Sequence, residues 1–147
     1  YYIKAYAEAY GRSTGLLKPE KGNTLRVERG VAEALPVPSG VADAVVSTLT
    51  LCTVLNPEQA LREVRRVLKP GGQFLFWEHV LCETNKRFAR IQRETTPEHI
   101  ENADGCRLDR RTLKTINAAG FQSVDGEYFE LEDFGLINPT IKGIAVA

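Results

Sequence analysis

The sequence predicts an α/β fold with a mostly parallel sheet. Residues 43–51 are apolar nearly throughout rather than alternating, which is typical of a parallel strand covered on both faces. Residues 56–68 have the pattern of an amphipathic helix, and residues 73–77 follow as a second buried strand. Strands that alternate with helices favour a parallel sheet with helices packed against it.

The helix at residues 56–68 has clear signals at both ends. Asn56 is a good N-cap, and Pro57 suits the first helical position. Residues 69–72, with the sequence Lys-Pro-Gly-Gly, stop the helix sharply. Its expected buried stripe consists of Ala60, Leu61, Val64, Val67 and Leu68, and its outer face of Arg62, Glu63, Arg65 and Arg66.

Two further elements are expected near the start of the chain. Apolar residues recur at helical spacing between Tyr2 and Tyr10, which predicts a helix that ends near residues 11–15. Residues 25–28 then predict a short strand, and a loop interrupted by two prolines follows at residues 30–40.

The C-terminal half is less regular. Residues 81–107 are weakly patterned, with a short helix in their middle. Asp109 is expected to cap a clearer helix that ends at Gly120. Residues 121–131 and 140–147 are expected to form two final strands.

The composition limits the class of partner. Nineteen Lys and Arg balance nineteen Asp and Glu, so the chain lacks the field that attracts nucleic acid, and no nucleic-acid partner is expected. No apolar run approaches the roughly 20 residues that span a bilayer, so we expect no membrane segment within this chain. The 147 residues suffice for one compact domain.

The cysteines argue against a disulfide framework and against a metal site. There are three (Cys52, Cys82 and Cys106), with no CxxC pair, and the two histidines add no ligand spacing. Reduced thiols of this kind favour a cytoplasmic protein. The chain starts at Tyr1 and contains no Met, so we expect further residues upstream, where any membrane anchor would lie.

Three places in the sequence are candidates for ligand binding. In an open α/β sheet, ligands bind beyond the carboxyl ends of the strands. This rule selects residues 30–33, residues 47–52, and the pair Glu78 and His79.

Three ordered stretches, residues 30–36, 43–52 and 61–72, resemble consecutive motifs of class I S-adenosylmethionine-dependent methyltransferases with a methyltransferase type 11 domain. A narrower similarity to the methyltransferase-like thiol methyltransferases lies in residues 51–52, 76–80, 104–106 and 141–147. The resemblance implies a Rossmann-like fold with an antiparallel C-terminal strand. It also implies S-adenosyl-L-methionine as cofactor and a small-molecule acceptor, most simply a thiol.

Carried onto this sequence, the resemblance implies a set of cofactor contacts. Ala32 and Glu33 would lie beside the adenine, largely through backbone groups. Val31 stands where most relatives have an acidic residue that accepts from the adenine amino group, which weakens that contact here. The other implied cofactor-binding residues are Ser47, Thr48, Leu49 and Cys52, the last of them near the methyl group.

On the acceptor side, the resemblance implies that Glu78 and His79 are catalytic. Methyl transfer needs mainly an in-line approach to the sulfonium methyl, and the cofactor carries the electrophile. A base helps when the acceptor must lose a proton, and the ordinary pKa of histidine, about 6.5, suits that role. Each of these residues also has a purely structural interpretation. His79 can be a hydrogen-bonded histidine, Glu78 an ion-paired glutamate, and Cys52 a small buried side chain.

Part of the family pattern is missing. No G-x-G-x-G loop occurs, and Tyr1 aligns just after the acidic residue that binds the ribose hydroxyls in the family. We therefore interpret residues 1–147 as a single partial methyltransferase domain, truncated at the N-terminus and lacking the first βαβ unit and the first two strands. The strand at 43–51 is then expected to be an exposed edge, and the chain alone to bind S-adenosylmethionine poorly or not at all.

Two alternative functions remain open from the sequence. Carbon- or oxygen-methylating enzymes of quinone biosynthesis share the second and third motifs. A degenerate or truncated domain can also act as a non-catalytic Rossmann-like interaction module. Residues 51–52 and 78–80 favour the thiol methyltransferases over the quinone enzymes.

Overall fold

The computed structural model describes residues 2–147, except for the side chains of residues 2–4 and 19. The chain forms two compact units, Tyr1–Gly30 and Val31–Ala147. Each unit has its own secondary structure, and the ligand-site candidates lie in the second, except for Gly30 at the end of the first.

The first unit contains the helix predicted near the N-terminus. Helix α1 spans Tyr2–Ser13, and a short 3-10 helix, η1, spans Pro19–Lys21. The rings of Tyr6 and Tyr10 stack 6.2 Å apart on α1, while the side chain of Tyr2 lies outside the described part. The strand predicted at residues 25–28 is wrong: residues 23–30 form neither helix nor strand, because no described strand pairs with them.

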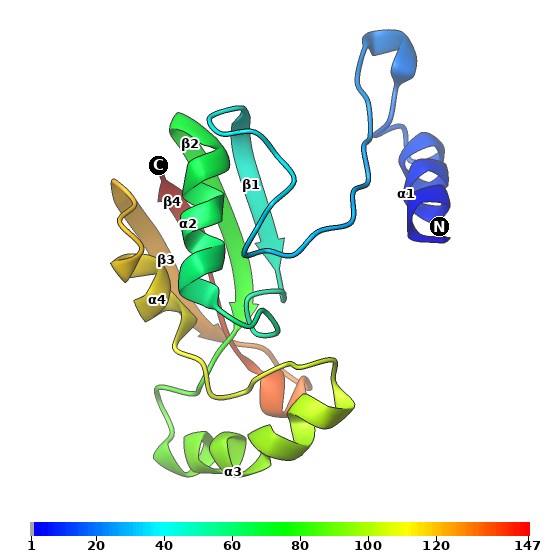
Figure 1. The fold of residues 1–147 in the computed structure, drawn as a ribbon. Helices are drawn as coiled ribbons and strands as arrows, with labels where there is room; N and C mark the ends of the chain where they lie inside the picture. The colour runs from blue at the N-terminus through cyan, green and yellow to red at the C-terminus, as the bar shows by residue number, and fades with distance from the viewer. Residues whose placement is uncertain (1) are drawn as a thin grey trace. The chain divides into compact units, whose positions relative to one another are not determined.

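The second unit is built on a four-stranded sheet in the order β1-β2-β4-β3 (Figure 1). The strands are β1 (Ala42–Thr48), β2 (Leu68–His79), β3 (Ser123–Glu130) and β4 (Pro139–Val146). Strand β1 pairs with β2 in parallel, whereas β4 is antiparallel to both β2 and β3. The α/β class and the antiparallel C-terminal strand are confirmed. Among the described strands, parallel pairing is confined to β1 and β2.

The helices of the second unit are α2 (Pro57–Val67), α3 (Lys86–Asn102) and α4 (Thr112–Ala118), with a 3-10 turn, η2, at Gly135–Ile137. Helices α2 and α4 lie over the same face of the sheet (Figure 1). The predicted buried stripe is confirmed: four of its residues are buried on α2, and the fifth, Leu68, is buried at the start of β2. Leu61 of α2, Phe74 of β2 and Ile116 of α4 are fully buried in one core between helices and sheet.

Of the two N-caps predicted from the sequence, the cap of α2 is confirmed and the cap of α4 is not. Asn56 caps α2 as predicted, because its Oδ1 accepts from the backbone N–H of Gln59 at 2.9 Å. The prediction that Asp109 caps α4 is wrong. Arg111 occupies that cap position without a side-chain bond, while Asp109 is paired with Arg107 at 3.1 Å. The helix starts later than predicted, so Asp109 lies two residues before the cap position.

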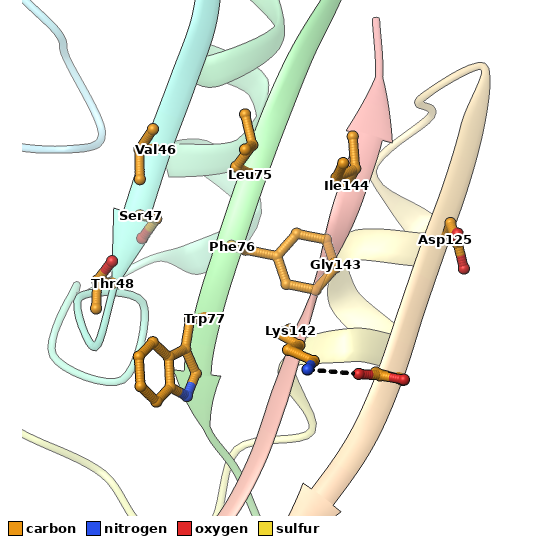
Figure 2. Close-up of a pocket in the computed structure, with 11 residues that line it drawn as sticks. Val46, Ser47, Thr48, Leu75, Phe76, Trp77, Asp125, Lys142, Gly143 and Ile144 are labelled. Atoms are coloured by element: carbon orange, nitrogen blue, oxygen red, sulfur yellow. Dashed lines mark ion pairs between the residues drawn. The ribbon is translucent and has the colours of Figure 1, made fainter.

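The opposite face of the sheet carries exposed apolar side chains. Val46 of β1 is 70% exposed, Trp77 of β2 is 44% exposed and Ile144 of β4 is 40% exposed. These residues line a pocket that runs across the strands (Figure 2). An ion pair between Lys142 and Glu127, with 2.8 Å between nitrogen and oxygen, borders it.

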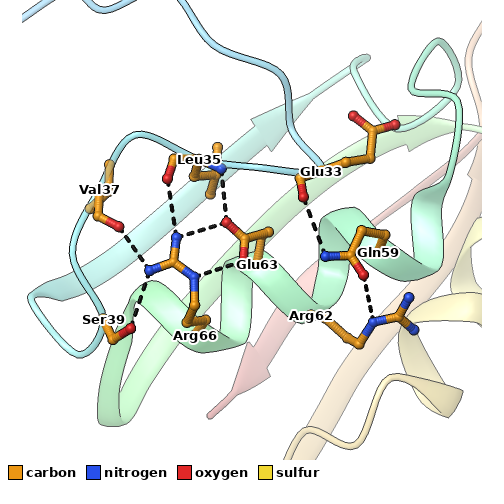
Figure 3. Close-up of polar contacts among 8 residues, drawn as sticks. All are labelled: Glu33, Leu35, Val37, Ser39, Gln59, Arg62, Glu63 and Arg66. Atoms are coloured by element: carbon orange, nitrogen blue, oxygen red, sulfur yellow. Dashed lines mark hydrogen bonds and ion pairs between the residues drawn. The ribbon is translucent and has the colours of Figure 1, made fainter.

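A polar network fastens the loop at residues 31–39 to α2 (Figure 3). The Arg66 guanidinium donates to the carbonyl oxygens of Val37 and Leu35 at 2.9 and 3.1 Å. Glu63 accepts from Arg66 at 2.7 Å and from the backbone N–H of Leu35 at 2.8 Å. These two residues were expected only on the outer face of α2, and they fix the loop that carries Ala32 and Glu33.

Acid should weaken this network. The hydrogen bonds from Arg66 lower the pKa of Glu63 from 4.5 to about 2. A carboxyl group whose pKa is lower in the folded state stabilises the fold above its unfolded pKa, and this contribution is lost as the pH falls toward the folded value. Unfolding free energy should therefore fall between pH 4.5 and pH 2, with a smaller fall in Glu63→Gln.

Urea unfolding of both proteins at several pH values in this range measures the difference. Glu94→Gln, on the exposed face of α3, is the matched control because it removes a carboxylate without touching the loop. Identical pH profiles for the wild type and Glu63→Gln would contradict the assignment.

Candidate functional site

The carboxyl ends of the parallel strands β1 and β2 lie side by side, and Glu78 joins them. Its side chain is fully buried. One carboxylate oxygen accepts from Ser47 Oγ at 2.6 Å and from the backbone N–H of Thr50 at 3.2 Å. The other accepts from the backbone N–H of Leu51 at 3.0 Å. Glu78 thus holds the loop after β1 in a fixed shape.

The charge state of Glu78 reflects two opposing effects. Burial raises its pKa above 4.5, because a buried carboxylate loses its hydration. The donors on Ser47, Thr50 and Leu51 act in the opposite direction by stabilising the anion. Both oxygens are engaged within the chain, so the geometry suits a positioning role.

His79 follows Glu78 and is also buried, with 2% of its surface exposed. Its Nε2 lies 3.0 Å from Cys106 Sγ, and its Nδ1 has no hydrogen-bond partner among the described groups. Burial lowers the pKa of His79 to about 4, with smaller contributions from His99 and Arg110. The imidazole is therefore neutral at pH 7.

Cys52 belongs to the loop that Glu78 holds. It is 2% exposed, as expected if it is a small buried residue, and its Sγ lies 3.5 Å from the carbonyl oxygen of Leu49. The sulfurs of Cys52 and Cys106 and a ring nitrogen of His79 all lie within 4.8 Å of one another. In the described part of the chain this is the one group of three or more His, Cys, Asp or Glu side chains that could share a metal ion.

The residues expected near the adenine lie in the loop before β1. Glu33 Oε1 accepts from the backbone N–H of Asn56 at 2.9 Å, and this bond lowers the pKa of Glu33. The Glu33 carbonyl oxygen accepts from Gln59 Nε2 at 3.3 Å (Figure 3). Val31 is 61% exposed and Ala32 is half-buried. The loop is thus anchored at the start of α2.

Two of the residues expected to line the cofactor are exposed at the end of β1. Thr48 and Leu49 are open to solvent, and Leu49 has a φ of 50°, which is rare for a residue other than glycine. Ser47 is half-buried because its hydroxyl is bonded to Glu78. The structure therefore brings Ser47, Cys52, Glu78 and His79 together around one loop, with Thr48 and Leu49 at its open side.

Two residues that the sequence did not single out hold the segments around the site: Arg110 holds the loop after β1, and Gln92 holds the segment after β2. Arg110 donates to the carbonyl oxygens of Leu51 and Val54, the latter at 2.6 Å. Gln92 of α3 is fully buried, and its amide accepts from Cys82 N at 2.7 Å and donates to Val80 O at 3.0 Å. Both lie in stretches rich in polar residues, where nothing in the sequence marks a buried side chain.

The arrangement combines a rigid strand-end loop with a neutral histidine and two thiols. Such a site can hold a small molecule against the ends of β1 and β2, where ligands bind in open α/β sheets. None of the described helices is both long and apolar enough to cross a membrane.

Comparison with known proteins identifies relatives on both the sequence and the structural level. Residues 4–76 match the family described as "Methyltransferase domain". Human thiol S-methyltransferase TMT1A is 40% identical over 111 residues, which are 75% of this chain and 46% of that protein. Rat thiol S-methyltransferase TMT1B is 45% identical over 86 residues, 58% of this chain and 35% of that protein.

A quinone enzyme and solved structures are also similar. The ubiquinone/menaquinone biosynthesis C-methyltransferase UbiE of Escherichia coli is 33% identical over 117 residues, 68% of this chain and 46% of that protein. The cyclase SpnF has a TM-score of 0.68 at 21% identity, over 97% of this chain and 61% of that structure. An S-adenosylmethionine-dependent methyltransferase from Thermotoga maritima has a TM-score of 0.60 at 20% identity, over 83% of this chain and 64% of that structure. These structures confirm the fold, and the chain spans less than half the length of the curated relatives it matches.

Proposed function

Because this chain belongs to the methyltransferase domain family, we propose that it is part of an S-adenosylmethionine-dependent enzyme that methylates a small-molecule thiol. The observation that carries the proposal is the site at the ends of β1 and β2, where Glu78 fixes the loop from Thr50 to Cys52 beside a buried neutral histidine. Its location agrees with the general rule for ligand binding in this fold class.

In this proposal the cofactor lies against the loop before β1 and the end of β1. Ala32 and Glu33 would face the adenine through their backbone, with Val31 at the edge. The exposed residues Thr48 and Leu49 would contact the rest of the cofactor. The network of Glu63 and Arg66 supports this surface by fixing the loop before β1. Ser47 supports the end of β1 through its bond to Glu78. The cofactor would supply the methyl group as an electrophile.

The acceptor would approach on the side of Cys52 and His79. Glu78 acts as a positioning residue, because both its oxygens are bonded within the chain. His79 is the candidate base: its imidazole is neutral at pH 7 and its Nδ1 is unbonded among the described groups. A thiol loses its proton more easily than an alcohol, so a weak base together with good alignment suits this acceptor.

A thiol is favoured over a quinone precursor by the comparisons. The thiol S-methyltransferases are 40–45% identical over 86–111 residues, whereas UbiE of Escherichia coli is 33% identical over 117 residues. The quinone-type reaction remains the second candidate because it shares the same two motifs. A non-catalytic interaction module is the third.

The sequence contains no glycine-rich loop, so the decisive test uses a chimera. The N-terminal part of human thiol S-methyltransferase TMT1A, up to the position that aligns with Tyr1, is joined to this chain. The chimera is incubated with methyl-labelled S-adenosylmethionine and either a small thiol or a demethylated quinone precursor. We expect the label on the thiol, and calorimetry of the 147-residue chain alone should give little or no heat of cofactor binding.

Each other result points elsewhere. Label on the quinone precursor alone would select the second candidate. A folded chimera that binds no cofactor would select the interaction module. Tight cofactor binding by the isolated chain would show that the site needs no glycine-rich loop.

A further inference from the structure

The loop between α3 and α4 brings a second cysteine to the buried histidine. Asp104 and Gly105 both have positive φ angles, 49° and 83°, and they turn the chain so that Cys106 faces the sheet. The backbone N–H of Arg107 then donates to the carbonyl oxygen of Cys52 at 3.1 Å. This bond joins the loop that carries Cys106 to the loop after β1, and the two sulfurs and a ring nitrogen of His79 lie within 4.8 Å of one another.

We propose that Cys52, His79 and Cys106 form a binding site for a zinc ion. Thiolate sulfur and imidazole nitrogen are the ligands that zinc prefers in proteins. Three protein ligands leave one tetrahedral position for water, as in catalytic zinc sites.

The geometry is close to what zinc requires. Zinc–ligand bonds of about 2.0–2.3 Å place neighbouring tetrahedral ligands roughly 3.5–3.8 Å apart. The three atoms here lie within 4.8 Å of one another, and His79 Nε2 is 3.0 Å from Cys106 Sγ. Shifts of about 1 Å or less would bring them to bonding positions. The three come from different segments that Glu78 and the bond from Arg107 hold in place.

The hydrogen bonding of the cluster also favours an ion. His79 is buried, yet one ring nitrogen faces only a thiol and the other has no partner among the described groups. Buried polar atoms normally have a strong partner. A metal ion would supply one to the histidine and to both sulfurs at once.

The charges balance. Zinc binding displaces one proton from each thiol to solvent, and two thiolates neutralise the divalent ion, so the buried site carries no net charge. Three other ionisable groups influence the cluster: Arg110, whose charge favours thiolates, Glu78, whose carboxylate favours a cation, and His99 near His79. Cys82 is buried elsewhere, where its sulfur meets the backbone N–H of Asn85.

One consequence rests on the proposed function. An acceptor thiol that replaced the water on zinc would release its proton to solvent on coordination, so His79 would serve as a ligand in place of the base role given to it above. The metal site itself is testable without any methyl transfer.

The experiment uses the untagged 147-residue chain, purified with a phosphine reductant. We expect elemental analysis to find one zinc per chain. Titration of the metal-free protein with Co²⁺ should give tetrahedral visible bands and a thiolate-to-cobalt band in the near ultraviolet, saturating at one equivalent. Cys106→Ser and His79→Gln should each weaken Co²⁺ binding by about 100-fold or more, whereas Cys82→Ser should bind as the wild type does.

A measurement on the wild type alone tests the proposal even if the variants fail to fold. Added zinc should raise the unfolding temperature and a chelator should reverse the increase, since a ligand that binds only the folded state stabilises it. The proposal is overturned if the folded chain binds no zinc or cobalt, or if Cys82→Ser lowers binding as much as Cys106→Ser. It is also overturned if Cys52 and Cys106 are found as a disulfide that persists in the reductant.

Discussion

Replacing Glu78 with alanine should lower the free energy of unfolding by about 3 kcal/mol, because buried donors left without an acceptor cost about 1–3 kcal/mol each. Glu78 accepts from Ser47 Oγ and from the backbone N–H groups of Thr50 and Leu51. The first two are only partly buried and can recover some of the loss through water, whereas the bond to Leu51 is fully buried.

The free energy of unfolding of Glu78→Gln should lie between those of the wild type and Glu78→Ala. It keeps the size of the side chain, but its NH₂ group must face one of the three donors. Urea unfolding followed by circular dichroism at pH 7 measures all of these variants. Glu83→Ala, which removes an exposed carboxylate nearby in the sequence, should stay within about 0.5 kcal/mol of the wild type. An equal effect of Glu78→Ala and Glu83→Ala would contradict the role given to Glu78.

Gly143→Ala should destabilise the protein by about 3 kcal/mol or more, since overpacking against rigid groups commonly costs 1–3 kcal/mol and sometimes exceeds it. Gly143 of β4 pairs with Gly126 of β3. A Cβ on Gly143 would overlap the carbonyl oxygen of Asp125 and lie 2.6 Å from Phe76 Cζ. The backbone oxygen cannot move without breaking the β3–β4 pairing.

Gly71→Ala is the matched control. Gly71 has a φ of 76°, but a Cβ there would meet no atom within 4 Å. The free energy of unfolding of Gly71→Ala should be only about 1–2 kcal/mol lower than that of the wild type, because of the unfavourable backbone angle. Thermal and urea unfolding of the two variants separate steric overlap from backbone strain. If Gly143→Ala lowers the free energy of unfolding no more than Gly71→Ala does, β3 and β4 are less closely packed than described.

The elements that could be predicted are those with local signals. Helix α2 was predicted to within a residue or two because its cap, its proline and its apolar stripe all lie inside the element. Strands β1 and β2 were located from runs that are apolar nearly throughout, but the cover expected on both faces of β1 is wrong, since Val46 is 70% exposed. By contrast, residues 25–28 have strand-like composition but no partner, and a strand depends on its neighbour.

The candidate site could be located but not assembled from the sequence. The rule on strand ends selected Glu78, His79 and Cys52, and these do lie together. The sequence could not show that Cys106 meets His79, since the two are 27 residues apart and joined through an irregular loop. It also could not distinguish Glu63 and Arg66, which hold a loop, from ordinary charges on an exposed helix face.

The strand order has a consequence for how the protein folds during synthesis. Strand β4 lies between β2 and β3, although it follows both of them in the chain. Strands β2 and β3 therefore have no lasting hydrogen-bonded neighbour on that side until residues 139–146 have left the ribosome. The pairing of β2 with β4 joins segments far apart in the chain and forms slowly, since the long intervening chain must first lose its freedom. The parallel pair of β1 and β2 can form early, but the completed sheet must form late, after a period in which its central edge stays open to chaperones or to other nascent chains.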